Sequence, residues 1–304
     1  MMIEQKLIEQ ITKENTVVVQ NEPMEKHTSF RIGGNADCLV EVKDTASLKA
    51  VVRLCRENNV PYFVLGLGSN LLVSDRGIEG VVIKLGGEFN EITLSEDNII
   101  RCGAGSTLAR LCVFARNMSL GGLEFAWGIP GSVGGAVYMN AGAYDGEIKN
   151  VVISAEYMDR DGNIRVYPRR ELDFSYRHSV FTDTDNIILN ASFRLEPRSQ
   201  EKITERMQEL MDRRKTKQPI NHPSAGSVFK RPAEGYAAAL IDECGLKGYT
   251  VGGAHVSEKH AGFIVNDNNA TAEDVLRLIE HIKTVVKREK NVELCCEVRY
   301  IGRQ

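Results

Sequence analysis

Residues 125–144, FAWGIPGSVGGAVYMNAGAY, form a run of twenty residues without a charge, which is long enough for a helix to cross a bilayer. Five glycines and Pro130 argue against such a helix, because a glycine inside a helix costs about 1 kcal/mol relative to alanine and a proline about 3 kcal/mol. Glycine lacks a Cβ, so its main chain can lie close to a large partner. The run therefore predicts uncharged backbone that faces a ligand.

Size and charge exclude several classes of protein. The 304 residues suffice for two modest domains or one large one. The 38 basic and 41 acidic residues give no overall field for nucleic acid or an anionic membrane, so an anionic ligand must be held locally. The first residues lack the apolar region of a signal peptide. Seven cysteines without a C-x-x-C pair indicate reduced thiols in a cytoplasmic protein, and no metal site is predicted.

The first two thirds of the chain alternate short apolar runs with helical patterns. Apolar runs predict strands at 61–65, 80–85 and 98–102, and helical periodicity predicts helices at 46–58 and 107–117. The sequence DRDGN at 159–163 predicts a hairpin, because Asp-Gly supports the positive φ of a tight turn. This part is therefore predicted to mix helices and strands.

The last third begins with a change of pattern at EPRSQ, residues 196–200, where we place a domain boundary. Ser199 is predicted to cap a charged helix that runs to Lys217. A later helix is predicted to begin at a capping box formed by Thr271 and Asp274. The run 292–301 then predicts a final strand.

Several turns rich in small residues follow predicted strands. Neither Gly66–Asn70 nor Gly103–Thr107 completes G-x-G-x-x-G, because leucine occupies the place of the third glycine, and this disfavours a Rossmann site. Taken separately, each of them, and the turn at 31–36, can be an ordinary tight turn. Together with 125–144 they suggest a long, phosphate-bearing cofactor that lies against the backbone in an extended pose.

Seven ordered blocks make the chain resemble the UDP-N-acetylenolpyruvoylglucosamine reductases, flavoenzymes of bacterial cell-wall synthesis: HTSFRIGGNA, GLGSNLLV, WGIPGSVGGAVYMNAGAY, FSYRHS, SAGSVFK, IDECGLKG and SEKHAGFIVN. The resemblance implies an α+β fold. It implies an FAD-binding domain of the vanillyl-alcohol-oxidase (PCMH) type over 1–198, to which 298–304 return. A smaller α/β substrate-binding domain is then expected over 199–297.

The resemblance also implies FAD as cofactor and NADPH as co-substrate. Some relatives in the wider superfamily tether flavin through a histidine, whereas the matching position here is Asn70, so we expect non-covalent FAD. The residues expected to contact FAD are Arg31, Gly33, Gly66, Gly68, Ser69, Asn70, Gly128, Pro130, Gly131, Ser132, Gly134 and Gly135.

Three residues match the family's catalytic positions. Reduction of an enol ether beside a carboxylate needs a hydride at C3, stabilisation of the charge that develops, and a proton at C2. Ser227 matches the proton donor, Arg177 the arginine that polarises the carboxylate, and Glu297 the glutamate that works with it. A carboxylate near the substrate's own carboxylate is favourable only if it is protonated or bridged, so we expect a raised pKa or a shared proton at Glu297.

Substrate contacts are predicted from charge and from the same motifs. The UDP diphosphate needs cations, for which Lys217 and Lys230 are candidates, and Tyr176 stands beside Arg177. His255 and His260 are either ligand contacts or packing residues. The segment after Arg177 is short, so the chain is similar to the subclass that lacks a tyrosine-bearing insertion over the diphosphate.

The resemblance thus predicts an enzyme that converts UDP-N-acetylglucosamine enolpyruvate to UDP-N-acetylmuramate for peptidoglycan, and so serves cell-wall biogenesis, cell shape and cell division. We expect ping-pong kinetics, a cytoplasmic monomer and no membrane insertion. An FAD-linked oxidase of the same superfamily is one alternative, although its histidine tether is missing. A non-catalytic UDP-sugar-binding regulator is the other, and the presence of all three catalytic residues argues against it.

Overall fold

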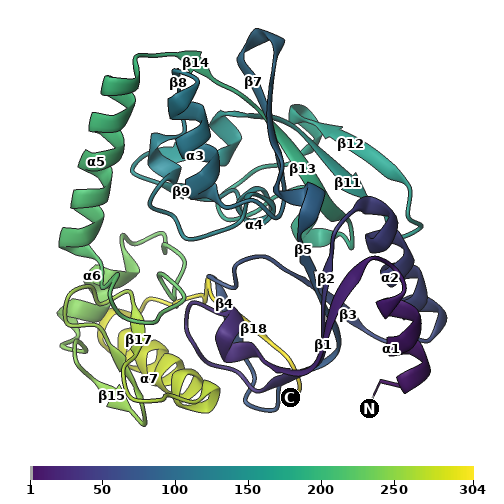
Figure 1. Cartoon of the computed structure of the whole chain (residues 1–304). Helices are drawn as coiled ribbons and strands as arrows, with labels where there is room; N and C mark the ends of the chain where they lie inside the picture. The colour runs from purple at the N-terminus through teal and green to yellow at the C-terminus, as the bar shows by residue number, and fades with distance from the viewer. Residues whose placement is uncertain (1–2) are drawn as a thin grey trace. The chain divides into compact units, whose positions relative to one another are not determined.

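The computed structural model describes residues 3–304 and has the predicted α+β class (Figure 1). These residues cluster into two compact units. Unit 1 comprises the residues up to Val19, Cys38–Leu67 and Gly80–Arg213; unit 2 comprises Gln20–Asp37, Gly68–Glu79 and Arg214–Gln304. This clustering groups the chain differently from the predicted boundary near 198. Which residues bind which ligand is a separate question, so the predicted binding domains stay a prediction.

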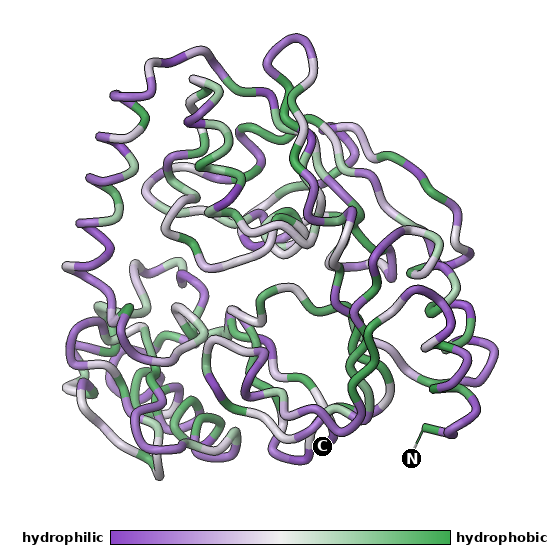
Figure 2. Tube along the Cα trace, viewed as in Figure 1, coloured by the Kyte–Doolittle hydropathy of each residue, from purple (hydrophilic) through white to green (hydrophobic). Residues whose placement is uncertain are grey.

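The chain begins with a four-stranded sheet of order β1-β2-β5-β3, in which β3 and β5 are parallel. Helix α2 begins at a capping box in which Asp44 accepts from the main-chain N–H of Ser47. Leu48, Val51 and Cys55 of α2 are buried in one apolar cluster with side chains of β2 and β5, and Figure 2 shows these strands as hydrophobic. The elements are α1 (Gln5–Thr12), β1 (Thr16–Pro23), β2 (Asn35–Val42), α2 (Thr45–Glu57), β3 (Tyr62–Leu65) and β5 (Ile78–Leu85).

Unit 1 also contains a five-stranded antiparallel sheet of order β12-β11-β13-β7-β6. The predicted hairpin at 159–163 is confirmed, because Asp159 N donates to Asn163 O and Gly162 has a φ of +81°. Helix α4 lies against β13. The elements are β6 (Ile92–Ser95), β7 (Ile99–Gly103), α3 (Leu108–Asn117), α4 (Val133–Tyr138), β11 (Val152–Met158), β12 (Ile164–Pro168) and β13 (Ile187–Arg194).

Two short ladders and one long helix complete this part of the chain. Helix α5 (Gln200–Lys217) is mostly hydrophilic along its trace (Figure 2), and it contributes Ile203, Met207 and Leu210 to the core under the sheet. The short ladders pair β8 (Leu120–Gly121) with β14 (Glu196–Pro197) and β9 (Gly142–Ala143) with β10 (Gly146–Glu147).

Unit 2 combines two small sheets with two helices. The predicted capping box of Thr271 and Asp274 begins α7, and the carboxylate of Asp75 accepts from the next two main-chain N–H groups. The apolar stripe of α7 is buried in one cluster with side chains from 225–229 and from β16. The elements are β4 (Leu71–Val73), α6 (Ala237–Glu243), β15 (Thr250–Val251), β16 (Ala254–Val256), β17 (Ile264–Asn266), α7 (Ala272–Lys290) and β18 (Arg299–Ile301).

The predicted final strand is wrong over most of its length. Only β18 is a regular strand, and Cys296 forms an isolated bridge with Phe229. The uncharged run 125–144 forms short turns around the six-residue helix α4 rather than one long helix. No helix within residues 3–304 is both long and apolar enough to cross a membrane.

Candidate active site

Two glycine-rich loops of unit 1 approach each other closely at Gly66 and Ser132. A Cβ added at Gly66 would lie 2.5 Å from Ser132 Oγ, and one at Gly135 would lie 3.3 Å from the same oxygen. Ser132 is buried and its hydroxyl accepts from Gly135 N at 3.2 Å, so it orders the turn that begins α4. Gly66 and Gly135 are exposed. Main chain without side chains is thus presented from two loops at one place.

The loop Gly103–Thr107 is hydrogen-bonded to the loop that contains Ser132. Val133 N donates to Ser106 O at 2.8 Å, Gly134 N donates to Ala104 O at 2.9 Å, and Leu108 N donates to Gly131 O at 3.0 Å. A Cβ at Gly134 would press against Ala104. The glycines of 103–107 therefore serve close packing of main chain on main chain, which is the tight-turn alternative for that loop.

The residues present fit an FAD dinucleotide, on the evidence of the space around these glycines. A Cβ at Gly66 would overlap Ser132 Oγ, so the two loops can lie this close only without a side chain at 66. The exposed peptide groups at 66 and 135 can then face a diphosphate. The predicted contacts Gly128, Pro130 and Gly131 belong to the same loop, and all three are at least partly exposed. When bound, FAD would be held here by main chain rather than by a charged side chain.

In unit 2, the loop that carries Arg31 and Gly33 is anchored to Ser224, the first residue of the SAGSVFK motif. Ser29 Oγ donates to Ser224 O at 2.7 Å, and Ser224 N donates back to Ser29 O at 3.1 Å. Gly33 has a φ of +137°, and a Cβ there would collide with Val73. Arg31 is exposed. Two motifs that are far apart in the sequence are therefore hydrogen-bonded neighbours.

Asn70 connects the GLGSN motif to the segment of Glu297. Its side-chain amide donates to Glu297 O at 3.1 Å, and Arg299 N donates to Asn70 O at 3.0 Å. The chain then continues into the parallel pairing of β4 with β18. Gly68, two residues earlier, has a φ of +62°, and a Cβ there would overlap the carbonyl of His27. The amide of Asn70 is thus engaged with protein main chain.

Ser227 and Glu297 lie on neighbouring segments that are joined by main-chain hydrogen bonds. Glu297 N donates to Val228 O at 2.7 Å, and Lys230 N donates to Cys295 O at 2.8 Å. On its other side the serine segment bridges Phe263. Ser227 is half-buried, and its hydroxyl donates to Phe229 O at 3.2 Å. The structure therefore brings two of the three predicted catalytic residues together within unit 2.

Arg177 lies in unit 1, in the two-residue turn of a small hairpin. Ser175 and His178 exchange main-chain hydrogen bonds of 3.3 Å, which leaves Tyr176 and Arg177 in the turn. Arg177 has a φ of +56°, which is uncommon for a residue with a side chain. Its guanidinium carbon lies 5.0 Å from the centre of the Tyr176 ring. Tyr176 is half exposed, so its ring is a platform for the arginine.

Sequence reasoning missed two residues around this turn, Asn140 and Glu147. Asn140 is fully buried and its amide donates to Ser175 O and to Glu147 Oε2. Hydrogen bonds from Lys149 and Asn140, together with the positive charges of Lys149 and Arg177, hold the pKa of the Glu147 carboxyl below its usual value against the opposing effect of burial. A single asparagine within an uncharged run was the available signal, because a buried amide needs partners.

The remaining predicted residues have separate positions. Lys217 ends α5 and Lys230 follows the serine segment, and both are exposed. His255 Nε2 lies 3.5 Å from Asp267, which His222 also contacts at 2.6 Å. The ring of His260 packs edge-on against Phe263, and burial lowers its pKa. His260 therefore matches the packing alternative.

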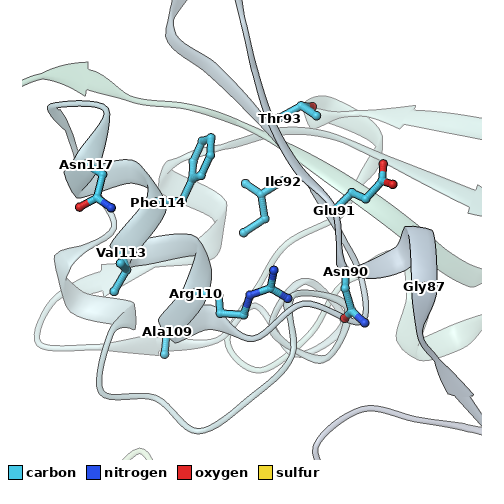
Figure 3. A pocket seen from close by; sticks show the side chains of 10 residues that line it. All are labelled: Gly87, Asn90, Glu91, Ile92, Thr93, Ala109, Arg110, Val113, Phe114 and Asn117. Carbon is cyan, nitrogen blue, oxygen red and sulfur yellow. The ribbon is translucent and has the colours of Figure 1, made fainter.

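A pocket of about 800 Å³ opens elsewhere in unit 1, between the turn η2 (Gly87–Asn90), β6 and α3 (Figure 3). Arg110 and Phe114 of α3 face Ile92 and Asn90 across it. None of the predicted site residues lines this pocket, and its lining mixes Arg110 and Glu91 with uncharged polar and apolar residues. We assign it no part in the candidate site.

Comparisons with known proteins cover both parts of the chain. The C-terminal-domain model of UDP-N-acetylenolpyruvoylglucosamine reductase matches residues 218–301, and an FAD-binding-domain model matches residues 36–167. A protein named UDP-N-acetylenolpyruvoylglucosamine reductase from Clostridium botulinum (strain 657 / Type Ba4) is 48% identical over 97% of this chain and 96% of its own. One of the same name from Caldanaerobacter subterraneus is also 48% identical, over 97% of both chains.

A solved structure is similar over almost the whole chain. It is the crystal structure of the UDP-N-acetylenolpyruvylglucosamine reductase from Thermus caldophilus, with 39% identity and a TM-score of 0.79, covering 94% of this chain and 98% of that one. These similarities extend over residues of both units.

Proposed function

The chain belongs to the UDP-N-acetylenolpyruvoylglucosamine reductase family, and from this premise we propose how its own residues act in the reaction. The family match and the FAD-binding domain make it an NADPH-dependent FAD reductase of enolpyruvyl-UDP-N-acetylglucosamine in peptidoglycan synthesis. When bound, FAD supplies to C3 of the enolpyruvyl group a hydride obtained from NADPH. The protein must then bind the carboxylate, stabilise charge and protonate C2.

Arg177 binds the substrate carboxylate in this proposal. A planar guanidinium can donate two parallel hydrogen bonds to a carboxylate, which fixes orientation as well as neutralising charge. Support comes from the Tyr176 ring beside it and from the turn, whose positive φ at Arg177 is the kind of backbone conformation that often accompanies function. Neutralisation of the carboxylate lets the charge that develops at C2 spread into it.

Ser227 donates the proton to C2, and Glu297 assists from the adjacent segment. The observation that carries this proposal is the pairing of Glu297 with the residue that follows Ser227, with 2.7 Å between Glu297 N and Val228 O. The Ser227 hydroxyl makes only a bond of 3.2 Å to Phe229 O, which it can exchange for a stronger base. A serine is a weak acid, but protonation of a carbanion requires position more than acidity.

Cofactor and substrate phosphates are held by the predicted loops and cations. The glycine loops at Gly66–Asn70 and Gly128–Gly135 hold the FAD diphosphate. Arg31 and Gly33, which belong to the separate motif HTSFRIGGNA, also contact FAD. Lys217 and Lys230 bind the UDP diphosphate. Support for non-covalent FAD comes from Asn70, whose amide is engaged with Glu297 O. Because its sugar substrate is linked to a nucleotide, we place the enzyme in the cytoplasm. We also propose that it acts as a monomer.

An absorption experiment tests the proposal. The purified protein should be yellow, lose that colour with NADPH in the absence of oxygen, and regain it when enolpyruvyl-UDP-N-acetylglucosamine is added. A flavin that is reoxidised by oxygen but not by this substrate would support the oxidase alternative. A folded, colourless protein that takes up no added FAD would support the regulator and overturn the proposal.

A further inference from the structure

The turn that carries Arg177 is held at its base by a buried side chain from a distant part of unit 1. Ser175 O accepts from His178 N within the hairpin and also from Asn140 Nδ2 at 2.9 Å. Asn140 is fully buried, and its Oδ1 accepts from Lys149 N at 3.0 Å. The amide therefore joins the turn to the main chain of the segment after the uncharged run.

Glu147 agrees with Ser175 O and Lys149 N on which way this amide faces. Its carboxylate can only accept hydrogen bonds, so the Asn140 nitrogen must point toward it, at 2.7 Å from Oε2. The amide oxygen is then left for Lys149 N, and the second N–H for Ser175 O. Lys149 Nζ, at 2.9 Å from the same carboxylate oxygen, keeps Glu147 in place. A reversed amide would oppose oxygen to oxygen at both Glu147 and Ser175.

The other side of the turn is anchored to the same run. Ser179 is fully buried, and its hydroxyl donates to Tyr138 O at 2.8 Å. Residues 138–147 thus contact the hairpin both before and after Tyr176 and Arg177. The proposed function gives no role to Asn140, the buried polar residue in the second half of the uncharged run. The Asn140 amide bonds Ser175 O at the base of the arginine turn, and its other two bonds, to Glu147 and Lys149, hold the amide in place.

We propose that Asn140 is a positioning residue for Arg177, with Glu147 orienting its amide, so that the guanidinium is presented to the substrate carboxylate. The inference rests on the proposed role of Arg177. Asn140 itself contacts no substrate in this scheme; it acts by restricting the backbone of an otherwise unfavourable turn. The alternative is an asparagine that only stabilises the fold.

The test measures the preference of the protein for a ligand with the carboxylate, defined as the ratio of two Kd values. The two ligands are enolpyruvyl-UDP-N-acetylglucosamine and UDP-N-acetylglucosamine, and the second lacks the carboxylate. Their Kd values for the oxidised holoenzyme are determined by calorimetry. Asn140→Ala should reduce the preference by about tenfold, the loss of about 1.4 kcal/mol, while the Kd of UDP-N-acetylglucosamine and the FAD content stay unchanged. Glu147→Gln should reduce the preference by about threefold.

Two further variants separate the possible outcomes. Asn190→Ala is the matched control, because Asn190 is buried in unit 1 and likewise donates to a glutamate, Glu156, at 2.8 Å; it should leave the preference unchanged. Arg177→Met should reduce the preference, and adding Asn140→Ala to it should cause no further loss, because both act through one group.

Each result decides something. An unchanged preference in Arg177→Met would overturn the proposed role of Arg177 itself. A loss in Arg177→Met without one in Asn140→Ala would overturn only the positioning role. Equal weakening of both ligands, or additive losses in the double variant, would show that Asn140 is merely structural. If Asn140→Ala does not fold, Glu147→Gln decides alone, and an unchanged preference there counts against the proposal.

Discussion

The three candidate catalytic residues are held in two different ways. In unit 2, Ser227 and Glu297 stand on segments joined by main-chain hydrogen bonds, including Glu297 N to Val228 O and Lys230 N to Cys295 O. In unit 1, Arg177 stands in a turn whose base depends on the side chain of Asn140. Main-chain pairing survives a change of side chain, whereas a side-chain network does not. Single substitutions near Arg177 should therefore disturb position, while those in unit 2 should remove chemistry and leave position intact.

Ser227→Ala should have the largest effect, and it tests the unit 2 side of this comparison. Reoxidation of the reduced flavin by the enolpyruvyl substrate should slow by about 10² to 10⁴, the usual contribution of a positioned general acid. Reduction by NADPH and the melting temperature should hardly change, because the pairing is main chain. Stopped-flow absorbance measures the two half-reactions separately; equal slowing of both would assign Ser227 a structural role.

Glu297→Gln should follow, with reoxidation slower by about 10². The substitution keeps the size of the side chain and every main-chain bond of its segment, so FAD content and the rate of reduction by NADPH should match the unmodified protein. Stopped-flow absorbance gives the FAD content from the initial flavin absorbance and the rate of reduction from its decay. Full retention of the reoxidation rate would remove Glu297 from the mechanism.

Asn70→Ala removes the side-chain bond to Glu297 O but leaves Arg299 N bonded to Asn70 O. Because the main-chain pairing remains, we expect a loss of about 0.5 to 1.5 kcal/mol in unfolding free energy and only a few-fold slower reoxidation. Asn35→Ala, which loses an exposed amide bond to Asn21, is the control. An effect on reoxidation as large as that of Ser227→Ala would contradict the main-chain account of unit 2.

The smallest expected effect concerns His178, beside Arg177. Both ring nitrogens face acceptors, Asp183 Oδ2 at 2.8 Å and Asp173 O at 3.1 Å, and the Asp183 hydrogen bond is the main cause that raises the His178 pKa above 6.5. The charged ring therefore stabilises the fold below pH 6.5, and this stabilisation is lost as the pH rises through the raised pKa.

His178→Gln should thus lower the unfolding free energy by up to about 1 kcal/mol near pH 5.5, and by less near pH 8. Chemical denaturation at the two pH values measures the difference from the unmodified protein. His222→Gln serves as a comparison, because its exposed ring also pairs with an aspartate, Asp267, but in unit 2. A larger loss at pH 8 than at pH 5.5 would contradict the assignment.

Most regular elements could be predicted from the sequence, because their signals are local. Helices α2, α5 and α7 begin near the residues expected from periodicity and caps, and the Asp-Gly hairpin is present. The strand predicted at 292–301 was wrong over most of its length, since the main chain of 295–297 makes isolated bonds to the segment 228–230 rather than one continuous ladder. Apolar alternation cannot distinguish these two cases.

The sequence by itself determined the family, the cofactor and the identity of the residues proposed for catalysis, because ordered motifs and glycine positions are written along the chain. The tertiary structure decided that Ser227 and Glu297 share hydrogen-bonded segments, that Asn70 bonds Glu297, and that Asn140 holds the Arg177 turn. These contacts join residues that are between 35 and 227 positions apart. Such pairings depend on how whole segments pack, since a buried amide or carbonyl takes the partner that packing places beside it.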